Sequence, residues 1–208
     1  MKLKMVLLLR NFYRKYLKSF LIFRMLKRFL FGLYSVFSTA ILAIYIYNNV
    51  FTFIPSNTLR VFYLRYVLGH KIGKNNFVHL GCNFYGKIKI GNNCVIGRKV
   101  ILKGGIIVIG NNVSITAETY IQTGSHFLDD ENFKSFETEI YIRDRAWIGL
   151  RSIILPGITL GEGSVLGAGS VLTKNIPDFQ VFAGVPAKYI KTRNRNISYN
   201  LDYRPYLE

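Results

Sequence analysis

An aliphatic or aromatic residue returns at every sixth position through most of the chain after Ile72. An amphipathic helix repeats its apolar positions about every 3.6 residues, and a half-buried strand repeats them every two. A spacing of six therefore favours a coil of short strands joined at corners, with one apolar anchor pointing inward on each side. Because three anchors complete one triangular coil, the pattern predicts a mainly β fold of about five coils over residues 72–185. The anchors are Ile72, Val78, Phe84, Ile90, Ile96, Leu102, Ile109, Ile115, Ile121, Ile142, Ile148, Ile154, Leu160, Leu166 and Leu172.

The other positions of the hexad carry residues suited to tight corners and a narrow interior. Glycine follows many anchors, as at Gly73, Gly91 and Gly149, often with asparagine close behind. These residue types tolerate positive φ, so we expect left-handed backbone at these corners. Four residues after the anchor stands a small or β-branched residue, which leaves room inside the coil for the larger anchor. These inner residues are Cys94, Val100, Val113, Thr119, Ser125, Ala146, Ser152, Ser164 and Ser170.

The end of the repeat has a specific resemblance. Residues 146–190, AWIGLRSIILPGITLGEGSVLGAGSVLTKNIPDFQVFAGVPAKYI, resemble the end of the catalytic domain of the hexapeptide-repeat acyltransferases. This family includes sugar O-acetyltransferases and the streptogramin and chloramphenicol acetyltransferases. The resemblance extends over roughly residues 69–193 and implies that the parallel β-helix is left-handed. It also implies acetyl-coenzyme A as the co-substrate and a homotrimer with a cleft at each subunit interface.

The hexad pattern breaks between Ile121 and Ile142, and an excursion from a regular coil is a common place for a functional site. We predict an excursion loop over residues 126–140, with His126 at its start. Acyl transfer from a thioester to a hydroxyl needs a base that works near neutral pH, which suits an imidazole. In the resembled enzymes a histidine at the corresponding loop position is the general base, which implies the same role for His126.

Two acidic residues follow His126 in the same loop. Asp129 and Asp130 are candidates to hold the second ring nitrogen of His126 or to bind the acceptor, although acidic loop residues are often only solvated. A backbone carbonyl is the alternative partner for the imidazole. The best-known sugar acetyltransferases place a carboxylate on the coil before the histidine, whereas this chain has no acid before Glu118. That departure implies a different acceptor.

For the donor, the resemblance implies a set of positions in the last coils. Trp147 precedes an anchor in AWIG, where related enzymes set an aromatic ring against the pantetheine arm, and Leu150 would contribute main-chain atoms. Lys188 and Lys191 would lie near the phosphates of coenzyme A. Related enzymes often have arginine at these two positions, and lysine lacks the bidentate geometry of arginine. The full implied set is Trp147, Leu150, Ala168, Thr173, Lys174, Lys188 and Lys191.

The charge of the chain is strongly positive and unevenly spread, with a formal net charge of +17 over 208 residues. Every charged residue before Glu118 is Lys or Arg, whereas the remainder is close to balanced. Such a distribution favours an anionic partner, either nucleic acid or a membrane surface. The chain has no zinc-finger, helix-turn-helix or RNA-binding signature, and Phe29 to Leu59 contains no charged residue. We therefore predict contact with a membrane surface and no nucleic-acid partner.

The topology of this apolar segment follows from the expected donor. Residues 29–47 are long enough to cross a hydrocarbon core. The basic residues before them would keep the N-terminus in the cytoplasm, so one full crossing would separate the β-helix from a cytosolic thioester. We therefore favour a monotopic or peripheral segment at the cytoplasmic face of the bacterial inner membrane. A transmembrane span and a helix that packs on the trimer stay open as alternatives.

These patterns divide the chain into four segments. Residues 1–55 form a basic, hydrophobic helical segment that associates with the membrane. Residues 56–71 form a linking amphipathic helix that is capped by Ser56 or Asn57 and docks on the first coil. Residues 72–185 form the β-helix, and residues 186–208 form a short C-terminal tail.

The cysteines and the other histidines do not form a metal-binding pattern. Cys82 and Cys94 lie two hexads apart and hence on different faces of the coil, so we interpret them as buried thiols in a reducing compartment. His70 and His79 are not clustered with His126 as ligands of a zinc site would be, and we expect them at the rim or surface. No metal is expected.

Together, the residues and the resemblance predict an O-acetyltransferase with His126 as general base. The predicted acceptor is a hydroxyl of a sugar in the synthesis of capsule, exopolysaccharide or lipopolysaccharide, with a lipid-linked saccharide as one form of it. An alternative is acetylation of a soluble small molecule such as serine, a nucleotide amino sugar or an antibiotic. A non-catalytic β-helical scaffold on the membrane is a third reading.

Overall fold

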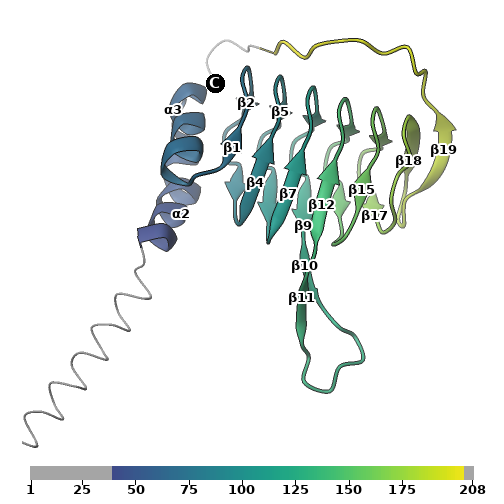
Figure 1. The fold of residues 1–208 in the computed structure, drawn as a ribbon, viewed down its shortest axis with the longest axis horizontal. Helices are drawn as coiled ribbons and strands as arrows, with labels where there is room; N and C mark the ends of the chain where they lie inside the picture. The colour runs from purple at the N-terminus through teal and green to yellow at the C-terminus, as the bar shows by residue number, and fades with distance from the viewer. Residues whose placement is uncertain (1–38, 204–208) are drawn as a thin grey trace, which may run out of the picture. The chain divides into compact units, whose positions relative to one another are not determined.

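The computed structural model describes residues 39–203, and its main body is a column of short strands in three parallel sheets (Figure 1). The first sheet contains β1 (Lys71–Ile72), β4 (Lys87–Ile90), β7 (Ile106–Ile109), β12 (Glu139–Ile142) and β15 (Thr159–Leu160). The second contains β2 (Phe77–Val78), β5 (Val95–Ile96), β8 (Ser114–Ile115), β13 (Trp147–Ile148), β16 (Val165–Leu166) and β18 (Gln180–Ala183), with β19 (Lys188–Thr192) antiparallel to β18. The third contains β3 (Asn83–Phe84), β6 (Ile101–Lys103), β9 (Tyr120–Gln122), β14 (Ile153–Ile154) and β17 (Val171–Leu172).

The predicted mainly β coil is confirmed by the register of these strands. Ile72 pairs with Ile90 and Val78 pairs with Ile96, so three hexads complete one turn and anchors stack on anchors. Every predicted anchor has at most 8% of its surface exposed. The column continues past the last anchor, because Ile176 bridges to Leu160 and β18 pairs with β16. The structure therefore has about six turns where the count of anchors predicts about five.

The left-handed corners occupy only one of the predicted hexad positions. Positive φ falls on the third residue after the anchor, which confirms the expectation for the asparagines at that position, Asn93 and Asn112. The expectation is wrong for the glycine directly after the anchor, which has another role. A Cβ on Gly91 would lie 2.5 Å from the carbonyl oxygen of Gly110, and a Cβ on Gly149 would lie 2.5 Å from the amide nitrogen of Ala168. These glycines therefore let successive turns approach closely. The positive-φ corner residues include Asn75, Asn93, Lys99, Asn112, Glu118, Arg145 and Arg151.

The small inner residues fill the column as predicted, with one exception. Ser125 is exposed, because the chain has already left the coil at that point to form a hairpin. The fully buried inner residues are Cys94, Val100, Val113, Thr119, Ala146, Ser152, Ser164 and Ser170. The thiols of Cys82 and Cys94 are buried and donate hydrogen bonds to backbone carbonyls, and burial raises the pKa of both.

A set of short helices packs on the first turn of the column. It comprises α2 (Thr39–Asn49) from Ala43 onward, the 3-10 helix η1 (Phe51–Phe53), α3 (Asn57–Phe62) and the π-helical turn η2 (Tyr63–Val67) (Figure 1). The predicted helix of residues 56–71 is thus an α-helix followed by a π-turn that ends at Val67. The Ser56 side chain caps the α-helix by accepting a hydrogen bond from the Leu59 amide.

These helices satisfy the polar groups at the open edge of the first turn. The Asn48 side chain accepts from the Phe84 amide and donates to the Phe84 carbonyl, and the Thr52 hydroxyl donates to the Cys82 carbonyl at 2.7 Å. The buried Arg60 guanidinium donates twice to the Val78 carbonyl, at 2.9 and 2.7 Å. Since the edge strands of a sheet otherwise leave backbone groups unpaired, the helices act as the end cap of the column.

The end cap changes the predicted boundary of the N-terminal segment. Residues 43–55 belong to the same compact unit as the β-helix, and Tyr47, Asn48 and Thr52 are buried in it. Residues 43–55 of the predicted segment 1–55 are therefore part of the folded unit, where they cap the first turn. Residues 1–38 lie outside the described part of the chain. Among residues 39–203, no helix has both the length and the apolar character that a membrane crossing requires.

The break in the hexads forms a protruding hairpin. Strands β10 (Gly124–His126) and β11 (Ser135–Glu137) pair antiparallel and leave the column between β9 and β12 (Figure 1). The predicted excursion over residues 126–140 is thus a two-stranded hairpin that begins slightly earlier.

The segment after β19 runs back along the column toward the first turn (Figure 1). The Arg193 guanidinium donates to the carbonyls of Arg145 and Gly163, and the Tyr203 ring stacks edge-on against Phe77. The predicted C-terminal tail is therefore a strand followed by a strap that contacts both ends of the column.

Candidate functional site

A shallow cleft of about 480 Å³ lies at the base of the hairpin. It opens where the chain leaves the third sheet, so both hairpin strands and the last residue of β9 form its wall. The lining residues are Gln122, Gly124, Ser125, His126, Ser135, Phe136 and Glu137.

His126 ends β10 and its imidazole is held from two sides by one residue. The Nδ1 atom lies 2.9 Å from the Phe133 carbonyl oxygen, and the two rings stack with centroids 4.0 Å apart and planes 11° apart. Because a carbonyl oxygen can only accept, this hydrogen bond requires the proton on Nδ1. In the neutral imidazole the Nε2 atom then carries the lone pair, and this tautomer can take a proton from a substrate.

The backbone of Phe133 has an unusual conformation that serves this contact. Its φ is +49°, a region that bulky residues rarely occupy. The Phe133 amide donates to the Asp130 carbonyl at 2.9 Å, and the Asp130 carboxylate accepts from the amides of Asn132 and Lys134. Asp130 therefore shapes the turn that aims the Phe133 carbonyl at His126.

The structure thus separates the two acidic residues of the loop. The Asp130 carboxylate bonds to the loop itself, with an ion pair to Lys134 at 3.5 Å, and acts on His126 only through the loop backbone. Asp129 is exposed on the same loop. The partner of the imidazole is a backbone carbonyl, which is the alternative that the sequence left open.

Glu137 is a carboxylate of the cleft that the sequence reasoning missed. It pairs with Gly124 across the hairpin, and its side chain lies next to Gly105 of the preceding turn. A Cβ on Gly105 would lie 2.8 Å from the Glu137 carboxyl carbon, so glycine leaves the space that the side chain occupies. The sequence indicated only that Glu137 is an acidic residue inside the break in the hexads. No sequence pattern distinguishes it from the other acidic residues of the loop.

Two of the donor-side residues lie along one row of cross-strand partners. Trp147 pairs with Val165, Val165 pairs with Val181, and Val181 pairs with Lys191. With strands about 4.8 Å apart, Trp147 and Lys191 lie about 14 Å from each other on one face. Lys188 lies on the same strand as Lys191 and pairs with Ala183.

The other donor-side residues occupy two corners of the column. Leu150 and Ala168 lie on the corner after β13 and β16, and the Leu150 carbonyl accepts from the Gly169 amide at 2.8 Å. Thr173 and Lys174 follow β17, at the same corner of the column from which the hairpin leaves two turns earlier, after β9. The structure therefore places Thr173 and Lys174 on the side of the column that carries His126.

The remaining histidines lie away from the cleft. His70 is buried between the end cap and the first turn, which corrects the expectation of a rim or surface position, and burial lowers its pKa to about 4. His79 packs against Phe77 and Tyr203 of the strap. Among residues 39–203, no group of His, Cys, Asp and Glu side chains has the arrangement of a metal site.

Comparisons with known proteins agree with the repeat. The family model described as the hexapeptide repeat of succinyl-transferase matches residues 140–174. The chain is 34% identical over 137 residues to an Escherichia coli protein described as a colanic acid biosynthesis acetyltransferase, and the match covers 64% of this chain and 75% of that protein. It is also 34% identical over 120 residues to the galactoside O-acetyltransferase of Escherichia coli, covering 56% of this chain and 55% of that enzyme. The chain thus spans about half the length of some curated relatives that it matches.

Solved structures with the same fold include two that hold coenzyme A or its acetyl thioester. A hexapeptide-repeat-containing acetyltransferase of Vibrio cholerae, complexed with acetyl-coenzyme A, has a TM-score of 0.65 at 28% identity, covering 76% of this chain and 86% of that chain. A galactoside acetyltransferase in complex with coenzyme A has a TM-score of 0.62 at 27% identity, covering 75% of this chain and 80% of that chain.

Proposed function

Since this chain belongs to the hexapeptide-repeat acetyltransferase family, we propose that it transfers an acetyl group from acetyl-coenzyme A to a hydroxyl of a saccharide. The observation that carries the proposal is the state of His126 in the cleft. Its Nδ1 proton is committed to the Phe133 carbonyl, so Nε2 presents a lone pair. A base with one nitrogen held and the other available is what activation of a hydroxyl requires.

The reaction proceeds by direct attack. As the acceptor oxygen forms a bond to the thioester carbonyl carbon, Nε2 of His126 takes the hydroxyl proton. The carbonyl oxygen becomes an oxyanion, and its collapse breaks the carbon–sulfur bond. The imidazolium then returns the proton to the leaving thiolate, so the base is regenerated and the thiol of coenzyme A is released.

The acceptor binds in the cleft beside the hairpin. Gln122 and Glu137 supply amide and carboxylate oxygens there, which suit the hydroxyl groups of a sugar. We assign the acceptor to cell-surface polysaccharide synthesis, a role supported by the relative described for colanic acid biosynthesis. Asp129 is the acid of the hairpin loop that remains a candidate for contact with a longer saccharide.

The donor binds along the last turns of the column. Trp147, which is partly exposed and donates from Nε1 to the Thr116 hydroxyl, packs against the pantetheine arm, and Leu150 and Ala168 border its path. Thr173 and Lys174 lie toward the hairpin, and Lys188 and Lys191 provide positive charge for the phosphates. The acetyl-coenzyme A complex of the Vibrio cholerae structure supports this choice of donor.

The active unit is a homotrimer on the cytoplasmic face of the membrane. The hairpin extends from the column, and its apolar residues Phe127, Leu128 and Phe133 are exposed in the single chain, with Leu128 at 95%. A neighbouring subunit that covers these side chains would also close the shallow cleft. Residues 1–38, which are basic and apolar, join the end cap in holding the trimer at the membrane.

The decisive test is acetyl transfer by purified protein. Labelled acetyl-coenzyme A is incubated with saccharide acceptors, and release of the free thiol is followed. His126→Ala should lower the turnover number by about a hundredfold or more, because the reaction loses its base. Glu131→Gln, which changes an exposed acid of the same loop, is the matched control and should keep full activity. Transfer that proceeds equally well without the imidazole would refute the proposal.

A further inference from the structure

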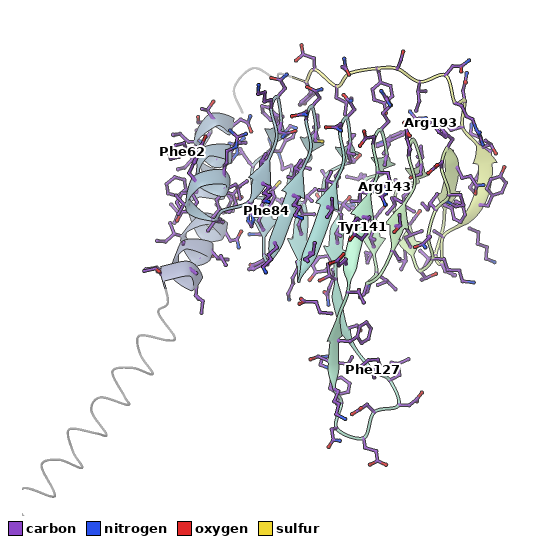
Figure 2. The ribbon with its side chains drawn as sticks, in the orientation of Figure 1. Phe62, Phe84, Phe127, Tyr141, Arg143 and Arg193 are labelled. Atoms are coloured by element: carbon purple, nitrogen blue, oxygen red, sulfur yellow. The ribbon has the colours of Figure 1, made fainter. Side chains whose placement is uncertain are left out.

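The end cap carries an apolar surface that faces away from the column. In α3 and η2 the side chains of Leu59, Phe62 and Tyr66 recur at helical spacing, and Figure 2 shows Phe62 pointing away from the strands. The opposite side of the same helix is buried against the first turn, so this is the outer face. The members are Tyr45, Val50, Phe53, Leu59, Phe62, Tyr66 and Val67, each between 48% and 66% exposed. We call them the apolar cap surface.

We expect a binding partner at the apolar cap surface, because exposed apolar patches on proteins mark interaction sites. Phe62 and Tyr66 lie with ring centroids 4.9 Å apart, so these two exposed rings form one continuous apolar patch. Phenylalanine, tyrosine and leucine are the residues that insert at the boundary between headgroups and acyl chains.

The charge around the apolar cap surface indicates which kind of partner binds there. From Met1 to Ala117 the sequence contains no Asp or Glu, so every charge that this part of the chain brings to the cap is positive. The strap brings one acid, Asp202, to a cleft that it shares with Asn57 and Thr58 at the start of α3. The Arg65 guanidinium lies 5.9 Å from the Tyr66 ring centroid. Phe53 and Lys99 both approach Gly81, where an added Cβ would lie 3.7 and 3.1 Å from them. One basic side chain thus lies beside Tyr66 and another lies near Phe53.

This charge disfavours a second copy of the chain as the occupant. Two cap surfaces that met face to face would bring Lys and Arg of one copy against those of the other, and such like-charge contacts cost free energy. An anionic lipid surface removes that cost, because the apolar side chains enter the acyl boundary while the basic side chains meet phosphate groups.

We propose that the apolar cap surface docks on a bilayer that contains anionic lipids, with Phe53, Phe62 and Tyr66 entering the interface. The end of the column then rests on the membrane through the folded end cap. This inference deepens the membrane attachment proposed above and assigns it to described residues. Vesicle binding is measured without acetyl-coenzyme A or acceptor, so its failure is distinguishable from failure of the proposed acetyl transfer.

The test compares the full chain with two double variants by co-sedimentation with vesicles. The vesicles are phosphatidylcholine alone, or phosphatidylcholine mixed with phosphatidylglycerol. Phe53→Ser with Phe62→Ser removes two aromatic side chains from the cap surface. Val185→Ser with Ile190→Ser removes two exposed apolar side chains far from the end cap and the hairpin and is the matched control. All substituted positions are exposed, and circular dichroism melts verify that each variant folds.

The cap variant should partition onto the mixed vesicles about tenfold more weakly than the full chain, because two aromatic side chains no longer leave water. The control should bind as the full chain does, and added salt should weaken binding of all three proteins. The inference fails if the cap variant binds as well as the full chain, which would assign all lipid affinity to residues outside the cap. It also fails if binding does not require phosphatidylglycerol. Self-association that the cap substitutions abolish, without vesicle binding, would assign the surface to a second copy.

Discussion

At the residue scale, the chemistry of the cleft depends on the conformation of Phe133. Its carbonyl determines which nitrogen of His126 carries the proton, and its ring limits the rotation of the imidazole. The positive φ of this bulky residue costs free energy, which the hydrogen bonds of Asp130 to the same turn offset. Phe133 is therefore a positioning residue for the proposed base.

We predict that Phe133→Leu lowers the turnover number about two- to tenfold, because the imidazole loses an aromatic stack worth about 0.5–1.5 kcal/mol. The Michaelis constant for acetyl-coenzyme A should stay the same, since the carbonyl and the donor side are unchanged. Phe133→Tyr keeps the ring and should restore activity, and steady-state kinetics measures both. Equal turnover numbers for the leucine variant and the original chain would show that the stack has no positioning role.

At the element scale, the end cap determines where the column stops. A parallel coil presents unpaired backbone groups on its first turn, and the cap helices pair with them through the side chains of Asn48, Thr52 and Arg60. Burial lowers the pKa of Arg60, yet its carbonyl partners satisfy the guanidinium without a carboxylate. The same helices present the apolar cap surface on their other side, so one element seals the column and supplies the proposed docking face.

Replacing Asn48 by alanine should lower the free energy of unfolding by about 2–4 kcal/mol, because the buried amide and carbonyl of Phe84 both lose their partner. Asn49→Ala is the matched control. The Asn49 side chain is exposed and bonds only within its own helix to the Tyr45 carbonyl, so its loss should change stability by less than about 0.5 kcal/mol. Urea denaturation of both variants gives the comparison, and equal stabilities would contradict the edge-capping role.

At the scale of the whole molecule, the stability of the fold responds to acid through a histidine that the cap buries. Burial lowers the pKa of His70 to about 4, whereas the unfolded chain has an ordinary value near 6.5. Between these values the unfolded chain binds a proton that the folded chain does not. The contribution of His70 to stability is therefore complete above about pH 6.5 and is lost as the pH falls toward 4, by up to about 3 kcal/mol.

The variant His70→Leu should reduce this dependence, because leucine does not titrate. Free energies of unfolding are measured for both proteins at several pH values between 7 and 4, and the difference between the two curves isolates the histidine from the carboxylates. The curve of the variant should be flatter over that window. Parallel curves would mean that the pKa of His70 is the same in the folded and the unfolded protein.

The sequence was sufficient for the features that depend on local repetition. The hexads predicted the coil, its buried anchors and most of its inner residues, since each anchor occupies the same position in every turn. The break after Ile121 located the hairpin and His126. The corner prediction was wrong at one hexad position, because spacing alone does not distinguish a glycine that relieves a close contact from a residue that adopts positive φ.

Only the tertiary structure decided the features that join distant residues. Three contacts show no pattern in the sequence, because each depends on where the chain returns in space. They are the hydrogen bonds of Asn48 to Phe84, the position of Glu137 beside Gly105, and the orientation of His126 by Phe133. The role of residues 43–55 also required the tertiary structure, because their apolar character is compatible with a membrane segment and with an end cap. Burial of one side of these helices establishes the end cap, and the exposed side carries the surface that we propose as the docking face.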